Sequence, residues 1–270
     1  MRSGSGDAAP LHVEVSGSGA NVLLAHGFGG SARNFRPQLR ALRGRYRTIV
    51  YDARGHARSA APEGASEYAP DRFVSDLGRA LDLAGAEHAV VGGLSMGAGV
   101  ALRFALAHPE RVQGLVLASF PAPAHAGGGF AAQAVGFARA LDEEGMLAAG
   151  ERFVWGEGSG LGPRDAALVR QGFLEHPPHA LAHVLRELIA VQPSVEALAP
   201  ELRRLDRPAL ILAGEMDAPS VATGEKLAVA LPRARLVVIP GAGHVVNLAR
   251  PEPFNAAVLA FLEREAFPTA

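Results

Sequence analysis

The sequence predicts an α/β fold in which helices cover both faces of a mostly parallel β-sheet. Short, continuous apolar segments, such as N-V-L-L-A at residues 21–25, alternate along the chain with longer segments of helical periodicity. A strand that is apolar at every position is buried on both faces, which is typical of parallel sheets. Polar or glycine-rich loops follow several of these segments, and parallel sheets bind ligands at the carboxyl ends of their strands.

Seven segments are expected to form strands, the first of them a weakly alternating edge strand and the others buried. They are residues 11–15, 21–25, 47–51, 89–91, 112–118, 209–213 and 234–239. Helices with an apolar stripe are expected between and after them, at residues 31–42, 71–84, from 96 to about 108, 221–231 and 251–266.

The stretch from 121 to 207 differs from the rest because it lacks convincing strands. It opens with a loop rich in proline, alanine and glycine and then carries helical patterns at residues 130–141, 146–155, 163–175 and 178–191. We therefore expect a helical insertion at 121–207 in a core domain formed by residues 1–120 and 208–270.

Composition excludes several classes of protein. The 270 residues include 27 acidic and 26 basic ones, so nothing indicates nucleic acid or an acidic membrane surface as a partner. The absence of cysteine excludes disulfides, thiolate metal sites and a cysteine nucleophile. Residues 1–10 lack the apolar segment of a secretion signal, and no apolar run approaches the roughly 20 residues of a membrane span. A cytoplasmic monomer or homodimer is expected.

A serine lies in the glycine-rich turn G-L-S-M-G at residues 93–97, between a predicted strand and a predicted helix. In this context G-x-S-x-G is the pattern of a nucleophile elbow, in which Ser95 occupies a sharp, strained turn. Gly93 and Gly97 are needed because a Cβ at either position would clash where the strand and the helix approach each other. The pattern alone is a weak signal, since an ordinary turn with an N-capping serine has the same residues.

A serine hydroxyl needs a base to remove its proton, most often a histidine oriented by a carboxylate. Asp217 and His244 follow the last two predicted strands, so both are expected at the same sheet edge as Ser95. We predict Ser95 as nucleophile, His244 as general base and Asp217 as its partner. The alternatives are a helix-capping histidine and a turn carboxylate. Glu215 is a competing acid, but it follows the strand directly and is expected to point elsewhere.

Acyl transfer also requires N–H groups directed at the developing oxyanion. One is predicted from Met96, which follows the nucleophile at a helix N-terminus. The second is predicted from Phe28 in H-G-F-G-G, whose glycines allow the loop to turn its amides inward. His26 is expected to orient this loop rather than to take part in catalysis.

These motifs resemble the α/β-hydrolase fold family over essentially the full length of the chain. The matching segments are H-G-F-G-G from residue 26, D-A-R-G-H-A-R-S from 52, G-L-S-M-G from 93, H-P-E-R-V from 108, G-E-M-D from 214 and G-A-G-H from 241. The resemblance implies an eight-stranded sheet, a cap formed by the insertion after the sixth strand, and the same roles for the triad and the oxyanion amides. Ala57 departs from the family, which usually has glycine in this loop.

The segment L-A-H-P-E-R-V from residue 106 and the compact size resemble the 3-oxoadipate enol-lactonase-like esterases and lactonases. This implies a serine hydrolase that cleaves a small carboxylic ester or lactone through an acyl-enzyme, without a cofactor. Carbon–carbon bond hydrolases usually have asparagine and tryptophan where this chain has Leu94 and Val245, which argues against them. A lyase of the menaquinone-pathway type and a non-catalytic ligand-binding homologue remain alternatives. Ser95 excludes the branches with an aspartate nucleophile.

Substrate contacts are predicted from Trp155, Phe120 and Val245, in an apolar pocket beneath the insertion. An arginine of the insertion that points inward would bind a substrate carboxylate, although most are expected in solvent. These arginines are Arg139, Arg152, Arg164, Arg170 and Arg186.

Three histidines lie close together in the insertion, at His176, His179 and His183. The last two are four residues apart on a predicted helix, a spacing that can bind a metal. Because no third ligand is evident, we expect surface histidines, and no metal site is predicted.

Overall fold

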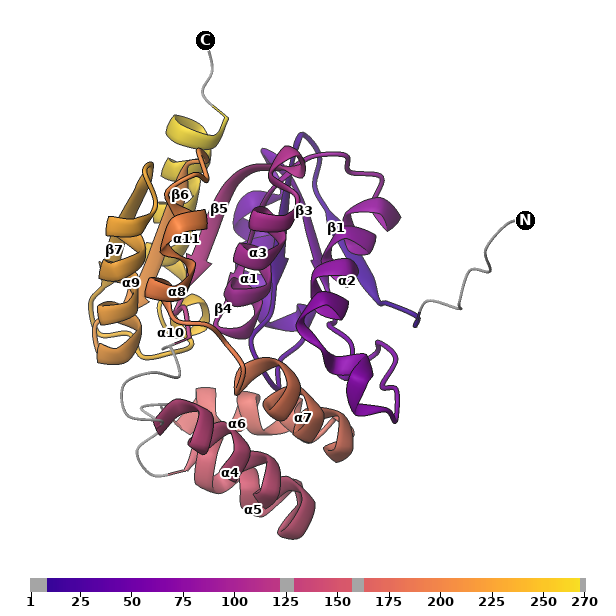
Figure 1. Ribbon diagram of the computed structural model, residues 1–270. Coiled ribbons are helices and arrows are strands. Elements are labelled where there is room, and N and C mark those ends of the chain that lie inside the picture. Colours follow the sequence, from indigo (N-terminus) through magenta and orange to yellow (C-terminus); the bar gives the residue numbers. More distant parts are fainter. Residues whose placement is uncertain (1–8, 122–128, 157–162, 268–270) are drawn as a thin grey trace.

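Seven strands form one sheet through the centre of the molecule (Figure 1). The computed structural model describes residues 9–121, 129–156 and 163–267. Within them the strand order is β1-β3-β2-β4-β5-β6-β7. β1 runs antiparallel to β3, and the other neighbouring strands pair in parallel, which confirms the predicted fold class. The strands are β1 (Val13–Ser16), β2 (Ala20–Ala25), β3 (Tyr46–Tyr51), β4 (Ala89–Leu94), β5 (Val112–Ala118), β6 (Ala209–Gly214) and β7 (Ala234–Ile239).

The eighth strand that the family resemblance implies is not found in the described residues, where the sheet has seven strands. Residues 9–12, which precede β1, contact the loop after β3 through single hydrogen bonds. Pro10 O accepts the Ala60 N–H, and His12 O accepts the Asp52 N–H. Proline has no N–H to return, so this segment does not extend the ladder. The seven segments predicted from the residues themselves are the seven strands observed.

Helices cover both faces of the sheet, as its uniformly apolar strands require. Along β2, Leu23 faces a cluster that contains α2, α3, α8 and α9, while Val22 and Leu24 face a second cluster that contains α1, α10 and α11. These helices are α1 (Arg36–Leu42), α2 (Pro70–Leu83), α3 (Met96–Ala107), α8 (Val195–Leu202), α9 (Ala218–Ala230), α10 (Val246–Ala249) and α11 (Pro251–Phe261). Short helical turns are η1 (Ala32–Phe35), η2 (Ala65–Tyr68), η3 (Pro109–Arg111) and η6 (Leu262–Ala266).

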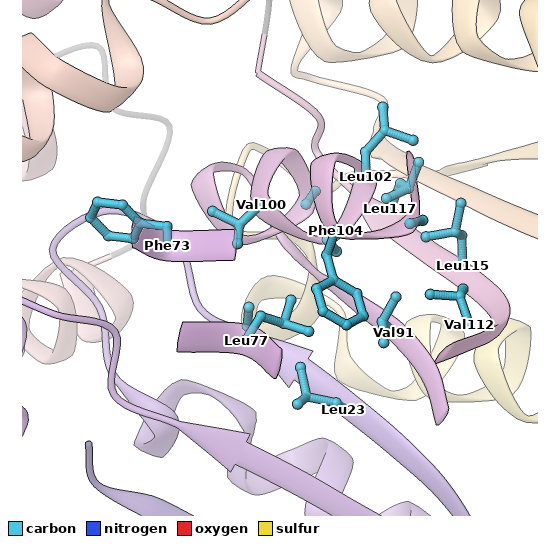
Figure 2. Close-up of a cluster of buried hydrophobic side chains, with 14 of the residues drawn as sticks. Leu23, Phe73, Leu77, Val91, Val100, Leu102, Phe104, Val112, Leu115 and Leu117 are labelled. Carbon is cyan, nitrogen blue, oxygen red and sulfur yellow. The ribbon is translucent and has the colours of Figure 1, made fainter. Parts of the chain in front are cut away.

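The packing of α3 against the sheet fixes the position of the residue that precedes this helix. Figure 2 shows Phe104 of α3 in the same apolar cluster as Leu77 of α2 and Val91 of β4. Phe104 is 1% exposed, and burial of such a side chain stabilises the fold by about 1.5–3 kcal/mol. Gly78 allows α2 to approach closely, because a Cβ there would lie 3.3 Å from the Phe104 ring.

A group of helices between β5 and β6 gathers beyond the carboxyl ends of the strands (Figure 1). We call them the inserted helices. They comprise α4 (Gly129–Glu143), α5 (Gly145–Gly150), η4 (Glu151–Trp155), α6 (Pro163–Phe173), α7 (Pro178–Val184) and η5 (Leu185–Ile189). They share an apolar cluster of their own, which includes Phe137, Phe173 and Leu181. α7 and η5 also contribute Ala180, Val184 and Leu188 to the cluster around the sheet. α8, which lies within residues 121–207 as well, packs only in that cluster, through Val195 and Leu202. None of the described helices is both long and apolar enough to cross a lipid bilayer.

Ala57 lies in the loop after β3, where the sequence departs from the family motif. Its φ is +44°, in the left-handed region that glycine adopts without penalty. Asp52 holds the loop, since its carboxylate accepts the Ala32 N–H at 2.8 Å and the Arg58 Nε–H at 2.7 Å. The loop therefore keeps a backbone conformation at Ala57 that is strained for alanine.

Replacing Ala57 by glycine should stabilise the protein. The left-handed conformation costs an L-residue about 1–2 kcal/mol, and the greater freedom of glycine in the unfolded chain offsets about 0.5–1 kcal/mol of this. A net gain of up to about 1 kcal/mol should raise the Tm by about 2–4 °C in calorimetry. Ala60→Gly, in the same loop but without a positive φ, should lower the Tm instead. A fall in Tm for Ala57→Gly would contradict the strain argument.

Candidate active site

Ser95 occupies the turn between β4 and α3, and its backbone is strained. Its φ is +52° and its ψ is −114°, a combination that residues other than glycine rarely adopt. The Ser95 N–H donates to Ala118 O at 2.8 Å. A Cβ on Gly93 would lie 2.6 Å from the carbonyl carbon of Gly97, and a Cβ on Gly97 would lie 2.1 Å from Ala25 O. The predicted reason for both glycines is confirmed, because strand and helix approach too closely for a side chain.

Ser95, His244 and Asp217 form a continuous hydrogen-bonded row at the carboxyl edge of the sheet. Nε2 of His244 lies 2.9 Å from Ser95 Oγ, and Nδ1 lies 2.6 Å from Asp217 Oδ2. Because a carboxylate can only accept, Nδ1 carries the proton and donates it to Asp217. Nε2 is then free to accept the Ser95 hydroxyl proton. The imidazole is therefore held in the tautomer that can deprotonate the serine.

The carboxylate of Asp217 is sheltered, whereas the His244 ring is open. Their side chains are 12% and 47% exposed. Asp217 is also the N-cap of α9, where its Oδ1 accepts the Ser220 N–H. Burial by itself raises the pKa of Asp217, but the hydrogen bonds from His244 and Ser220 outweigh burial and hold the pKa below its usual value. The carboxylate is thus charged beside the imidazole at neutral pH.

Glu215, the competing acid, has a different partner. Its Oε2 accepts the Gly241 N–H at 2.9 Å, in the loop that follows β7. Its carboxylate therefore braces the backbone of this loop, while Asp217 contacts the His244 ring itself. The expectation that Glu215 points elsewhere agrees with this contact.

The loop after β2, residues 26–30, is a tight turn that we call the HGFGG loop. The Gly30 N–H donates to Gly27 O at 3.0 Å and closes the turn. His26 donates from Nδ1 to Gly27 O at 2.8 Å, and its Nε2 accepts the Ala53 N–H at 2.9 Å. His26 thus joins the loops after β2 and β3, which agrees with the orienting role expected for it.

Two backbone amides beside Ser95 are not used to hold the turns together. In the HGFGG loop the Gly29 N–H donates to Nε2 of His56 at 3.2 Å and the Gly30 N–H closes the turn, whereas the Phe28 N–H takes part in neither contact. Met96 is the first residue of α3, so its N–H has no partner within the helix. The loop reaches the serine closely, since a Cβ on Gly27 would lie 3.6 Å from Ser95 Cβ.

A cavity of about 400 Å³ opens at Ser95 and His244, between the HGFGG loop and the inserted helices. Four phenyl rings form part of its wall. Phe137 stacks on Phe153 with 4.6 Å between ring centroids and meets Phe28 edge-on at 5.5 Å. Such a wall suits an uncharged, apolar group. Other lining residues are Asn34, Phe130, Gln133, Val154, Val169, Leu185, Ile189 and Val245.

Two of the three predicted substrate contacts do not line this cavity. Val245 does. Phe120 is 2% exposed and belongs to the apolar cluster around the sheet. Trp155 packs over Gly150, where a Cβ would overlap its ring, and its indole N–H donates to the Glu151 carboxylate. Both predictions are corrected because the two aromatic rings are occupied in packing within the core and the insertion.

The arginines of the insertion contact carboxylates of the insertion itself. Arg139 pairs with Glu143 and Arg152 with Glu144, both on exposed helix surfaces, and Arg186 contacts Asp142. Arg170 is exposed. Arg164 lies outside the residues whose side chains are described. No arginine is present in the described lining of the cavity.

The three histidines of the insertion do not come together as ligands. His176 is only 4% exposed, so the expectation of a surface residue was wrong for it. Its ring contacts backbone carbonyls of the insertion and of the HGFGG loop, which no spacing in the sequence could indicate. His183 stacks on Tyr68, and His179 is half-buried near Ala61 O. Within the described part of the chain, no three His, Cys, Asp or Glu side chains are arranged to hold a metal ion.

Comparison with known proteins aligns nearly the whole chain. The model of the alpha/beta hydrolase family matches residues 22–257. A putative carbamate hydrolase RutD from Caulobacter sp. (strain K31) is 31% identical, over 98% of this chain and 100% of its own length. The solved enol-lactonase from Burkholderia xenovorans LB400 is 26% identical with a TM-score of 0.82, covering 95% of this chain and 97% of its own. A thermophilic esterase from Thermogutta terrifontis is 29% identical with a TM-score of 0.83, covering 94% and 93%.

Proposed function

The chain belongs to the alpha/beta hydrolase family, and we propose that it is a serine hydrolase that cleaves a small carboxylic ester or lactone through an acyl-enzyme. One observation carries this proposal. Ser95 Oγ, the His244 ring and the Asp217 carboxylate form a row with distances of 2.9 and 2.6 Å, and this row opens into an apolar cavity. A row of this kind activates a serine for attack on a carbonyl carbon.

In the first half of the proposed reaction, Ser95 Oγ attacks the substrate carbonyl carbon while His244 Nε2 takes the hydroxyl proton. The carbonyl π bond becomes an oxyanion, which then collapses and breaks the bond to the leaving oxygen. His244 gives its proton to that oxygen, which departs as an alcohol or, in a lactone, stays attached to the opened acyl chain. Asp217 remains ionised throughout and stabilises the imidazolium.

In the second half, water attacks the acyl-enzyme and gives a proton to His244. The bond between the acyl carbon and Ser95 Oγ breaks, and Oγ recovers the proton from His244. The products are the free carboxylic acid and the unmodified serine. No cofactor takes part in the proposed cycle.

The oxyanion is proposed to be bound by the N–H groups of Phe28 and Met96. Met96 begins α3, so the positive end of the helix dipole adds to its hydrogen bond. A single donor of this kind is worth on the order of 10²–10³ in turnover in related chemistry. The position of the HGFGG loop supports this assignment, because Gly27 lies close to Ser95 and Phe28 lines the same cavity as the serine.

We assign the inserted helices as a cap that closes the cavity over the substrate. Phe130, Phe137 and Phe153 come from these helices and line the cavity, whereas α8 packs on the body and is left out of the cap. Carbamate is small and polar, whereas a 400 Å³ cavity with an aromatic wall favours a larger and less polar acyl group. The lactonase and esterase neighbours are in line with an ester or lactone of that kind.

The experiment that tests this function is a substrate panel. It contains p-nitrophenyl acetate, butyrate, octanoate and benzoate, a set of lactones, and carbamate. We expect hydrolysis of the neutral esters or lactones, with butyrate or benzoate cleaved more efficiently than acetate because their acyl groups fill more of the apolar cavity. Inert esters and lactones combined with turnover of a carboxylate-bearing cyclohexadiene would favour the lyase alternative. A folded protein that no fluorophosphonate probe labels at Ser95 would favour a non-catalytic homologue.

A further inference from the structure

A buried histidine of the cap segment touches the HGFGG loop through a backbone carbonyl. His176 lies between α6 and α7 and is 4% exposed. Its Nδ1 is 3.0 Å from Phe173 O, at the end of α6, and its Nε2 is 2.9 Å from Gly30 O. The ring therefore spans the gap between the inserted helices and the loop that supplies the Phe28 amide.

Both partners of the His176 ring are acceptors. A carbonyl oxygen cannot donate, and a neutral imidazole carries one N–H, so a neutral ring would set a nitrogen lone pair against one of the two carbonyls. His26 and His56 differ in this respect, since each has one carbonyl and one backbone N–H as partners. A single N–H on Nε2 is enough to join the His176 ring to Gly30 O.

The segment around His176 holds the HGFGG loop at two adjacent residues. The Phe173 ring covers Gly29, where an added Cβ would lie 2.5 Å from Phe173 Cδ2. His176 fixes the carbonyl of Gly30, the residue whose N–H closes the turn around Phe28. Phe28 lies inside this turn. A displacement of Gly30 therefore changes the orientation of the peptide plane that carries the Phe28 N–H.

We propose that His176 is a positioning residue that joins the cap to the HGFGG loop and thereby sets the direction of the Phe28 N–H. The inference rests on the proposed function for its consequence in catalysis, but the contact between His176 and the loop does not. His176 does not line the cavity, so it acts through the loop and not on the substrate. The contact of the cap with the HGFGG loop and the correct placement of the Phe28 N–H for the oxyanion then occur together.

The groups that face His176 are two further imidazole rings and one ion pair. The His56 ring meets it edge-on at 5.1 Å, and His26 meets His56 at 4.9 Å. Burial lowers the pKa of His26 to about 4 and holds that of His56 well below its usual value, so both rings are neutral at working pH. The neighbouring Glu175 carboxylate accepts from Arg33 at 2.6 Å and joins the cap to η1, which follows the HGFGG loop.

The kinetic test uses His176→Gln, which keeps one donor, and His176→Phe, which keeps none. We expect kcat for a p-nitrophenyl ester to fall at least about tenfold in His176→Phe, and less in His176→Gln, with little change in KM, since a misaligned oxyanion donor weakens transition-state binding. Glu175→Gln is the matched control. It removes the exposed ion pair between the neighbouring cap residue and η1 and should leave kcat close to the native value.

The second readout is the position of the HGFGG loop itself. In nitrogen-15 spectra the Phe28 amide resonance should shift in His176→Phe and stay close to its native position in Glu175→Gln. An unshifted Phe28 amide or native kcat in His176→Phe would each overturn the proposal. If the native protein cleaves no ester or lactone at all, the proposed function fails while the spectra still test the contact between His176 and the loop.

Discussion

Ser95→Ala should lower kcat for ester hydrolysis by about 10⁵–10⁶-fold, the largest effect expected from any single substitution in this chain. The variant keeps His244, Asp217 and the backbone amides, but it has no atom to form the acyl-enzyme. The residual rate would come from binding and oxyanion stabilisation alone, which are worth about 10³–10⁴ over the reaction in water. The loss should be the same for every substrate that the protein cleaves.

The substitution should leave the fold intact, which makes the loss interpretable. Alanine is an L-residue like serine, so the strain at φ +52° is unchanged, and one hydrogen bond to a half-exposed histidine is lost. Steady-state kinetics with p-nitrophenyl butyrate and fluorophosphonate labelling measure the effect, and calorimetry checks the fold.

Ser119 provides a matched control for this measurement. It also follows a strand with a positive φ, +44°, and it is fully buried outside the described cavity lining. Ser119→Ala should therefore retain both activity and labelling. A Ser95→Ala protein that hydrolyses the ester at the native rate would refute the nucleophile assignment, and with it the acyl-enzyme mechanism.

The three residues of the row could be predicted from the sequence because topology alone brings them together. Parallel strands end at one edge of the sheet, and Asp217 and His244 follow β6 and β7 within a few residues. Short loops leave little freedom in where such residues lie. Gly93 and Gly97 were predictable for a similar reason, since strand and helix must approach closely on either side of Ser95.

The residues that the sequence could not place depend on packing between distant segments. Trp155 and Phe120 are aromatic and stand near the expected pocket in sequence, but their rings turn to Gly150 and to the sheet cluster. His176 was expected at the surface because no third metal ligand was evident in the sequence. Helical periodicity gives no information on a linker that contacts residue 30. The eighth strand was implied by the family, whereas the part of the chain that the structure describes contains seven strands.

Asp217→Asn should lower kcat by about 10⁴-fold, as expected when a carboxylate that fixes the histidine tautomer is replaced by an amide. Asparagine can present its NH₂ to Nδ1, which then accepts, so that the proton moves to Nε2 and the ring can no longer deprotonate Ser95. In the native protein the pKa of Asp217 lies below its usual value, so the carboxylate stays charged as the pH falls to about 4. Loss of activity above that pH therefore reports a group other than Asp217.

Glu215→Gln is the comparison that separates the two candidate acids. Glu215 accepts the Gly241 N–H and does not touch the His244 ring, so its replacement should cost about 1–3 kcal/mol of stability at most and leave the pH profile unchanged. The kcat and the thermal unfolding of both variants are measured together. A change in the His244 tautomer lowers kcat without lowering stability, whereas a loosened loop after β7 lowers stability. If Glu215→Gln lost as much kcat as Asp217→Asn at equal stability, the acid would be misassigned. The 2.6 Å contact between Asp217 and His244 argues for the opposite result, because only a carboxylate in direct contact with Nδ1 can set which nitrogen carries the proton.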